Sequence, residues 1–393
     1  MTTAAASGLD LQRIERQAWI VGLCGVAACV LGARLNLDQF FRSYLVAFCF
    51  CLGIALGSLA ILLLQYLTGG GWGLVLRRPL EAGTRTLPLM AVLFIPVVLG
   101  TGSLYIWSDA DMVKGDAALE WKHPYLNVPF FAGRAIFYFV AWLAFTFLLN
   151  RWSRKEDQAQ PLGSDHAFRN LCGVGLGVYG LTMTFAAIDW AMSLDPHWSS
   201  SMYGALFAFS QVLAAFSCMT AVVILLGTVP PLSEQLHPQR LRDLGNLLMA
   251  FVMMWAYLAF SQYLLVWSGN LREEIPWYLH RMEGGWEYVA LGLLFFSFVL
   301  PFLMLLSGDV KTNPKLLVRV AGLVLAMRFV ELIWLIKPAF AHAHSHFELH
   351  WLDLATLVGL GGIWLGYFIG QIRKMPLLPL RDPRLLEASD HHE

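Results

Sequence analysis

The chain has 393 residues, of which 58% are hydrophobic and 14% are charged, and its formal net charge is zero. Because soluble domains carry about 25% charged residues, this composition excludes an ordinary soluble protein and predicts an all-α polytopic membrane protein. The balanced charge offers no basic surplus for nucleic acid, and no stretch of polar sequence is long enough for a separate soluble domain.

Ten hydrophobic runs qualify as membrane spans, since a bilayer core takes about 20 apolar residues per helix. They lie at 18–33, 43–67, 87–107, 130–150, 171–192, 203–229, 244–266, 286–306, 316–336 and 352–372. No small-residue cleavage site follows the first, short run, so we expect it to be a retained helix. These runs predict a tail at 1–17, a ten-helix membrane domain at 18–372 and a second tail at 373–393.

The lysine and arginine residues between the runs predict the orientation, because positively charged loops stay on the cytoplasmic side. Seventeen lie in segments on the side of the N-terminus, seven lie in segments on the opposite side, and three lie within runs. Both termini are therefore expected in the cytoplasm. The long outer loops 108–129, 268–285 and 337–351 are rich in aromatic and charged residues, as a docking surface for an external partner would be.

Histidine and cysteine positions argue against a redox metal held by this chain. Haem of the b type needs histidines near the middle of membrane helices, whereas all eleven histidines lie in loops, at the ends of runs or in the tail. The six cysteines lie in apolar runs without a C-x-x-C motif, which is typical of packing residues. In "HAHSHFELH" (342–350), His346 and His350 have a spacing that allows a metal site, although an exposed or partner-covered loop is the simpler interpretation.

Ionisable residues at membrane depth each cost at least about 2.5 to 3.5 kcal/mol, so they mark pathways or buried pairs. Arg328 and Glu331 lie one turn apart within 316–336, which predicts an ion pair that is either structural or a proton relay. Asp189 has no cation in its own helix turn, so a partner such as Arg134 must reach it from another helix if it is to stay ionised.

Small and hydroxyl-bearing residues recur at three and four spacing on three runs, which places them on one face of each helix. Such faces let membrane helices approach closely, and packing is the first interpretation. The alternative is a path for protons or quinol. Its candidate residues are Asp189, Tyr179, Thr182, Ser210, Gln211, Tyr257, Ser261, Gln262, Arg328, Glu331, Arg134 and Asp353.

The segment "DPHW" is predicted to form an outer turn between 171–192 and 203–229. Asp195 before Pro196 ends the helix, and its side chain is expected to cap the next backbone N–H groups. His197 and Trp198 would then lie at headgroup level, where aromatic residues anchor a membrane protein. The alternative is a direct role in proton exchange with the outer aqueous phase.

Several stretches together resemble one family. They are "IDWAMSLDPHW" with "SMYG" (188–204), "DLGNLLMAFVMMWAYLAFSQYLLVWSGNLREEIPWYL" (243–279), "QYLTGGGWG" (65–73), "RRPLEA" (77–82) and "YLNVPFF" (125–131) followed by Arg134. They resemble the F subunit of bacterial alternative complex III, a quinol:cytochrome c (or other acceptor) oxidoreductase, which is related to the NrfD-like membrane subunits of polysulfide reductase. Ser199 and Arg272 depart from that pattern at loop positions.

The resemblance implies two four-helix bundles plus two further helices, in the cytoplasmic (inner) membrane of a bacterium. It implies a subunit that binds no cofactor directly and conducts protons or interacts with quinol or quinone, with haem and iron–sulfur clusters in partner subunits. Those partners would be an NrfD-like C subunit, a multihaem cytochrome, an iron–sulfur protein and a monohaem cytochrome, besides membrane lipids. Two other functions stay open: a secondary solute transporter, for which no clear repeat emerges, and a purely structural membrane anchor.

Overall fold

The computed structural model describes residues 10–157, 166–340 and 347–379, and all regular secondary structure in these ranges is helical. Nine helical segments there are long and apolar enough to cross a membrane. They are α1 (Leu11–Leu35), α2 (Leu37–Thr68), Gly73–Leu99 built from α3 to α5, α9 (Val128–Asp157), α10 (His166–Trp190), α11 (Tyr203–Leu226), α13 (Pro238–Gly269), Trp286–Leu306 built from α15 to α16, and α19 (Trp351–Arg373). The predicted all-α polytopic membrane fold is confirmed.

A further helix, α18 (Pro314–Ile336), is also long enough to cross, because its 23 residues span about 34 Å at about 1.5 Å per residue. It differs from the other nine in its charge, because Arg319, Arg328 and Glu331 lie along it. It packs along α11 inside the bundle. The ten predicted spans therefore correspond to nine apolar helical segments and one helix that carries buried charge.

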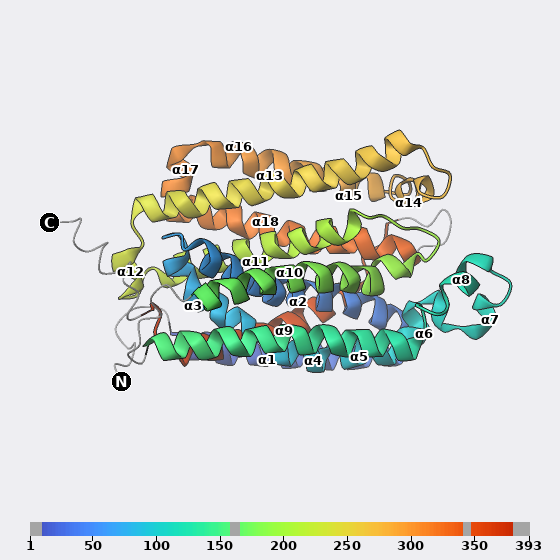
Figure 1. The fold of residues 1–393 in the computed structure, drawn as a ribbon, viewed down its shortest axis with the longest axis horizontal. Helices are drawn as coiled ribbons and strands as arrows, with labels where there is room; N and C mark the ends of the chain where they lie inside the picture. The colour runs from blue at the N-terminus through green and yellow to red at the C-terminus, as the bar shows by residue number, and fades with distance from the viewer. Residues whose placement is uncertain (1–9, 158–165, 341–346, 380–393) are drawn as a thin grey trace.

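The remaining helices are short and lie between the spans or divide them. They are α3 (Gly73–Thr84), α4 (Leu87–Leu93), α5 (Ile95–Leu99), α6 (Thr101–Leu104), α7 (Ala110–Val113), α8 (Ala117–Lys122), α12 (Leu232–Gln235), α14 (Ile275–Leu279), α15 (Trp286–Leu293), α16 (Leu300–Leu306) and α17 (Gly308–Thr312). A π-helical segment, Leu294–Val299, joins α15 to α16 just before Pro301. Figure 1 shows α6 to α8 and α14 gathered at one end of the molecule.

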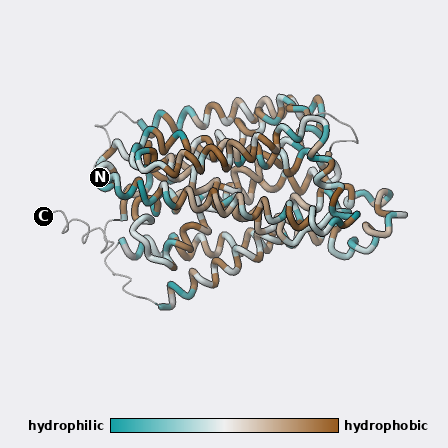
Figure 2. Tube along the Cα trace, turned by 90° about the horizontal axis from the view of Figure 1, so that it is seen from above, coloured by the Kyte–Doolittle hydropathy of each residue, from teal (hydrophilic) through white to brown (hydrophobic). Residues whose placement is uncertain are grey.

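Taken in chain order, the spans from α2 to α18 form two groups of four, and α1 and α19 form a pair. The first group holds α2, the α3 to α5 segment, α9 and α10, and the second holds α11, α13, the α15 to α16 segment and α18. Helices α2 and α11 pack together and join the groups, while α1 and α19 pair beside the first group. Figure 2 shows hydrophobic residues along the middle of the bundle and hydrophilic residues near its ends, as a membrane protein requires.

Glycines set the distance between α1 and α19. A Cβ added at Gly25 would lie 2.5 Å from the Gly359 backbone nitrogen, and one added at Gly362 would lie 2.6 Å from Gly22. Small residues at such a crossing let two helix backbones touch, which is a common source of stability between membrane helices. Glu15 near the start of α1 forms an ion pair with Arg373 at the end of α19, so the two helices have these ends on the same side.

Several helices begin earlier than the hydrophobic runs predict. Helix α1 begins at Leu11 and not at residue 18, and the third span begins at Gly73 and not at residue 87. The second difference is informative, because the hydrophobic runs 43–67 and 87–107 leave Arg77, Arg78 and Arg85 between two spans. Arg77 and Arg78 instead lie buried on α3, where carboxylates compensate their charge, and Arg85 follows directly as its C-cap residue.

Candidate functional site

The first polar cluster surrounds Asp189, which is fully buried at the outer end of α10. Arg134 of α9 reaches it with two hydrogen bonds, each 2.9 Å, from Nε and Nη2 to the two carboxylate oxygens. Tyr138 donates a third from its hydroxyl at 2.8 Å. The Arg134 guanidinium also lies 3.8 Å from the ring centre of Tyr125 and donates to the Tyr125 carbonyl oxygen at 2.8 Å. The partner expected from the sequence is therefore present: a cation from another helix forms charge-assisted hydrogen bonds with Asp189.

Deeper along α10, polar side chains link three helices. The Thr182 hydroxyl, about 10 Å from Asp189 along the helix axis, accepts a hydrogen bond from Trp142 Nε1 at 2.9 Å. Tyr179 donates from its hydroxyl to the Ala208 carbonyl oxygen at 3.3 Å and lies 3.4 Å from Gln211 Oε1. Of the predicted residues on α10 and α11, Tyr179 and Gln211 therefore lie together in the buried interior.

The second cluster lies in the middle of the membrane-spanning region and joins α11, α13 and α18. The Arg328 Nη1 atom lies 2.7 Å from Glu331 Oε2, which confirms the predicted pair. Trp255 donates from Nε1 to Glu331 Oε1 at 2.6 Å, and the Ser210 hydroxyl donates to Glu331 Oε2. The Arg328 guanidinium lies 4.0 Å from the ring centre of Trp255. Its Nε and Nη2 atoms are buried and have no hydrogen-bond partner among the described residues.

The prediction for α13 is partly wrong. Tyr257 lies on the outside of the bundle with 64% of its surface exposed, and Ser261 is half-buried. The buried face of the helix instead carries bulky residues such as Trp255 and Leu258, together with Gln262. The pattern of small residues gave the wrong inner face because large apolar side chains fill the interface between α13 and the bundle. Gln262 alone of the three predicted residues points inward, and its Oε1 atom has no partner in the part of the chain that is described.

Asp353 belongs to a separate cluster at the outer end of α19. Its carboxylate lies 2.5 Å from Lys337 Nζ and accepts a hydrogen bond from the Ser43 hydroxyl at 2.6 Å. It also accepts from the His350 backbone N–H at 2.9 Å, as the acid of a capping box. This carboxylate therefore fixes the start of α19. His346 lies outside the described residues, and within those described no group of three or more potential metal ligands is found.

The "DPHW" segment forms a turn between α10 and α11, and contacts from this turn hold the loop helices in place. The His197 Nε2 atom lies 2.7 Å from Asp116 Oδ2, and Lys122 Nζ donates to the Pro196 carbonyl oxygen at 2.5 Å. The hydrogen bond with His197 is the largest cause that lowers the pKa of Asp116 below its usual range. Trp198 is buried and stacks on Trp277 with 4.5 Å between ring centres. It therefore packs inside the protein and does not contact lipid headgroups as predicted.

The predicted capping role of Asp195 is not found. Helix α11 begins after Met202, and no side chain caps its first turn. Asp195 instead acts through its backbone, where its carbonyl oxygen accepts from the Trp198 N–H at 3.1 Å. Pro196 and the two residues that follow it hold the turn without the side-chain cap.

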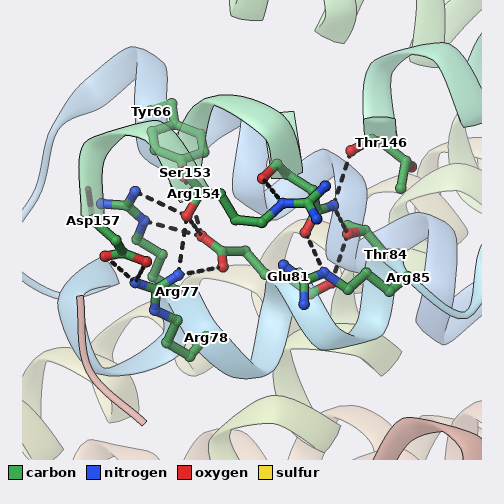
Figure 3. A network of polar contacts seen from close by, with 11 residues as sticks. Tyr66, Arg77, Arg78, Glu81, Thr84, Arg85, Thr146, Ser153, Arg154 and Asp157 are labelled. Atoms are coloured by element: carbon green, nitrogen blue, oxygen red, sulfur yellow. Dashed lines mark hydrogen bonds and ion pairs between the residues drawn. The ribbon is translucent and has the colours of Figure 1, made fainter. Parts of the chain in front are cut away.

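A buried charge cluster that the sequence analysis missed lies at the opposite end of the bundle, where α3 packs against the C-terminal end of α9 (Figure 3). Glu81 is fully buried and lies 3.1 Å from Arg77 Nε and 2.8 Å from Arg78 Nη1. The Ser153 hydroxyl donates a hydrogen bond to Glu81 at 2.6 Å, and Arg78 Nη2 forms a second ion pair with Asp157 Oδ1 at 2.6 Å. The signal that reveals this cluster is the spacing within "RRPLEA", since both arginines lie one turn before the glutamate.

Arg281 was also missed, and nothing in its local sequence points to its role. It is buried in the segment after α14 and donates to the backbone carbonyl oxygens of Trp277, Trp334 and Leu335 at 2.9, 3.2 and 2.8 Å. Burial lowers the pKa of Arg281 to about 10, which leaves the group cationic at neutral pH. A cation at this point stabilises the C-terminal end of α18.

A scan against protein-family models finds none that matches this chain, and a search of curated proteins finds no match. The helices define an integral, multi-pass membrane protein. Within that class, its distinguishing feature is a series of buried ionisable and hydroxyl-bearing side chains that starts near one end of the bundle and reaches its centre.

Proposed function

We propose that this chain is a membrane subunit of a bacterial quinol-oxidising electron-transfer complex and that it conducts protons through its helix bundle. The observation that carries the proposal is the central cluster, in which Glu331 receives three hydrogen-bond or charge contacts, one from each of three helices. In this proposal the electrons travel through haem and iron–sulfur groups of partner subunits. The resemblance to the F subunit of alternative complex III supports the same assignment.

The central cluster is more polar than packing requires. Replacing a buried ion pair by apolar residues is often neutral or stabilising, so such a pair contributes little to stability by itself. Arg328 also presents two buried N–H groups without partners among the described residues, and such groups are normally satisfied by water or a ligand. Both facts favour a site that exchanges protons over a simple structural pair.

Polar groups continue from this cluster toward both ends of the bundle. On the outer side they are Gln211, Tyr179, Thr182 and the Asp189 pair. On the other side, Ser217 and Thr220 of α11 and Gln65 of α2 are buried and have side-chain atoms without partners in the described ranges. Beyond Gln65 lies the Glu81 cluster, toward which Tyr66 donates a hydrogen bond at 3.3 Å. Proton relays in membrane proteins use such rows of ionisable and hydroxyl groups.

Glu331 is the residue in this row that takes up and releases a proton on its carboxylate. Arg328, Trp255 and Ser210 each contact its carboxylate and fix the orientation of that group. A purely structural anchor would need the same contacts but no change of protonation at Glu331.

The test is proton translocation by the assembled complex in liposomes that carry the Glu331→Gln variant. The expected result is a loss of about a hundredfold, the lower end of what one positioned proton-transfer group contributes, with the complex still assembled. Asp353→Asn is the matched control, because it removes another buried, paired carboxylate outside the row. Unchanged translocation in Glu331→Gln would leave only the structural anchor.

A further inference from the structure

A cavity of about 670 Å³ lies between α4, α9 and α19, at the end of the bundle where α1 begins and α19 ends. This is the side expected to face the cytoplasm. Three cationic side chains line the cavity: Arg85, Arg154 and Lys374. Glu331, Asp189 and the polar residues between them do not line it, and the cavity touches the Glu81 cluster only at Asp157.

Within the described part of the chain, the cavity wall holds more cationic than anionic side chains. Asp157, the one carboxylate in the cavity wall, is already paired with Arg78. Across the described ranges, Arg85, Arg154 and Lys374 form no ion pair. The site therefore carries a surplus of positive charge at a membrane surface.

Asn150 holds two of these cations next to each other. Its side-chain oxygen accepts a hydrogen bond from Arg85 Nε at 2.6 Å, and its backbone oxygen accepts from Arg154 Nε at 3.2 Å. Figure 3 shows the two side chains side by side, beside the Glu81 cluster. The Arg85 Nη2 atom is buried and has no partner within the described chain. Two adjacent guanidinium groups, one of which has an N–H group without a partner, are suited to bind an anion.

Part of the cavity wall is apolar and reaches the outer surface of the bundle. Leu143 and Phe147 lie one turn apart on α9, and Phe147 has 57% of its surface exposed. In a membrane this surface contacts acyl chains. A basic pocket between transmembrane helices on the cytoplasmic side, continuous with an apolar surface, is typical of sites for anionic lipid headgroups.

We propose that this cavity binds an anionic phospholipid of the cytoplasmic leaflet. Its phosphate lies between Arg85, Arg154 and Lys374, and one acyl chain follows Leu143 and Phe147. Because the cations come from the end of α3, from α9 and from the segment after α19, the bound lipid connects the α1 and α19 pair to the first four-helix group. The inference needs only the membrane orientation and is independent of proton conduction.

The test is lipid binding by the full chain in its purified, delipidated complex, with phosphatidylglycerol and phosphatidylcholine in nanodiscs as probes and native mass spectrometry as the readout. We expect retention of phosphatidylglycerol over phosphatidylcholine, and a loss of about tenfold or more when Arg154→Gln and Lys374→Gln are combined. Both residues are exposed, so the variant is expected to fold. Arg151→Gln is the matched control, since Arg151 is an exposed cation of the same helix outside the cavity.

Three results would overturn the proposal. Equal retention of the two lipids by the unchanged protein would remove the preference for anionic headgroups. An equal loss in Arg151→Gln would show that general surface charge is responsible. Complete displacement of phosphatidylglycerol by inorganic phosphate at the same concentration would identify a site for a small anion and not for a lipid.

Discussion

Asp189 is a buried carboxylate whose hydrogen-bond partners, among the residues described, lie on α9. Arg134 provides two hydrogen bonds and Tyr138 one, and the guanidinium is itself held against Tyr125. Removing one partner of such a pair leaves an uncompensated charge in a medium of low dielectric constant.

We therefore expect Arg134→Met to lower the free energy of unfolding by about 3 to 5 kcal/mol, measured by denaturant titration of the purified protein in detergent. The double variant Arg134→Met with Asp189→Asn should recover much of this loss, because it removes the buried charge as well. If the single variant is as stable as the unchanged protein, Asp189 does not depend on Arg134.

Asp116 provides a pH-dependent contact outside the membrane. The hydrogen bond with His197 lowers its pKa in the folded protein, so the contact is fully present above the ordinary Asp value and is lost as the pH falls through the lowered pKa. Limited proteolysis of the 110–122 loop should therefore stay constant from pH 7 down to about pH 4 and increase below it. Asp116→Asn should increase cleavage already at pH 7, and equal cleavage of both proteins there would contradict the docking.

At the scale of helices, close packing of α1 and α19 depends on which face a glycine occupies. Gly361 and Gly362 are neighbours on α19, yet a Cβ at Gly362 would lie 2.6 Å from the Gly22 backbone while one at Gly361 would meet nothing within 4 Å. Two backbones that touch have no flexible side chain that can move aside.

Gly362→Ala should therefore lower the free energy of unfolding by about 1 to 3 kcal/mol, whereas Gly361→Ala should stay within about 0.5 kcal/mol of the unchanged protein. Thermal or denaturant unfolding in one detergent measures both variants. If the two variants changed the free energy of unfolding equally, the contact at Gly362 would not be what holds the two helices together.

The helices also show how far the sequence predicts the structure. Long apolar runs predict the spans well, because hydrophobic length is the dominant requirement of a bilayer. The start of α3 was missed because Arg77, Arg78 and Glu81 look like a polar loop until their pairing in space is known. The prediction that Tyr257 lies on the inner face of α13 was wrong. A stripe of small residues does not distinguish an inner face from an outer one when bulky residues fill the core.

The same limit applies to the site. The Arg328 and Glu331 pair could be predicted because both residues lie one turn apart on one helix. Their partners Ser210 and Trp255 come from α11 and α13, and only the packing of three helices brings them together. Arg281 has no local signal at all, since its partners are backbone oxygens. Contacts between distant segments are what the sequence of one chain leaves undetermined.

For the whole molecule, the central claim is that Glu331 changes protonation while the complex oxidises quinol. Redox-induced infrared difference spectroscopy measures this directly, through the carbonyl stretch of a protonated carboxyl group. We expect a carboxyl band that changes on quinol oxidation in the unchanged complex, is absent in Glu331→Gln and persists in Asp353→Asn. A spectrum without such a band, or one that Glu331→Gln leaves unaltered, would contradict the proposed proton path.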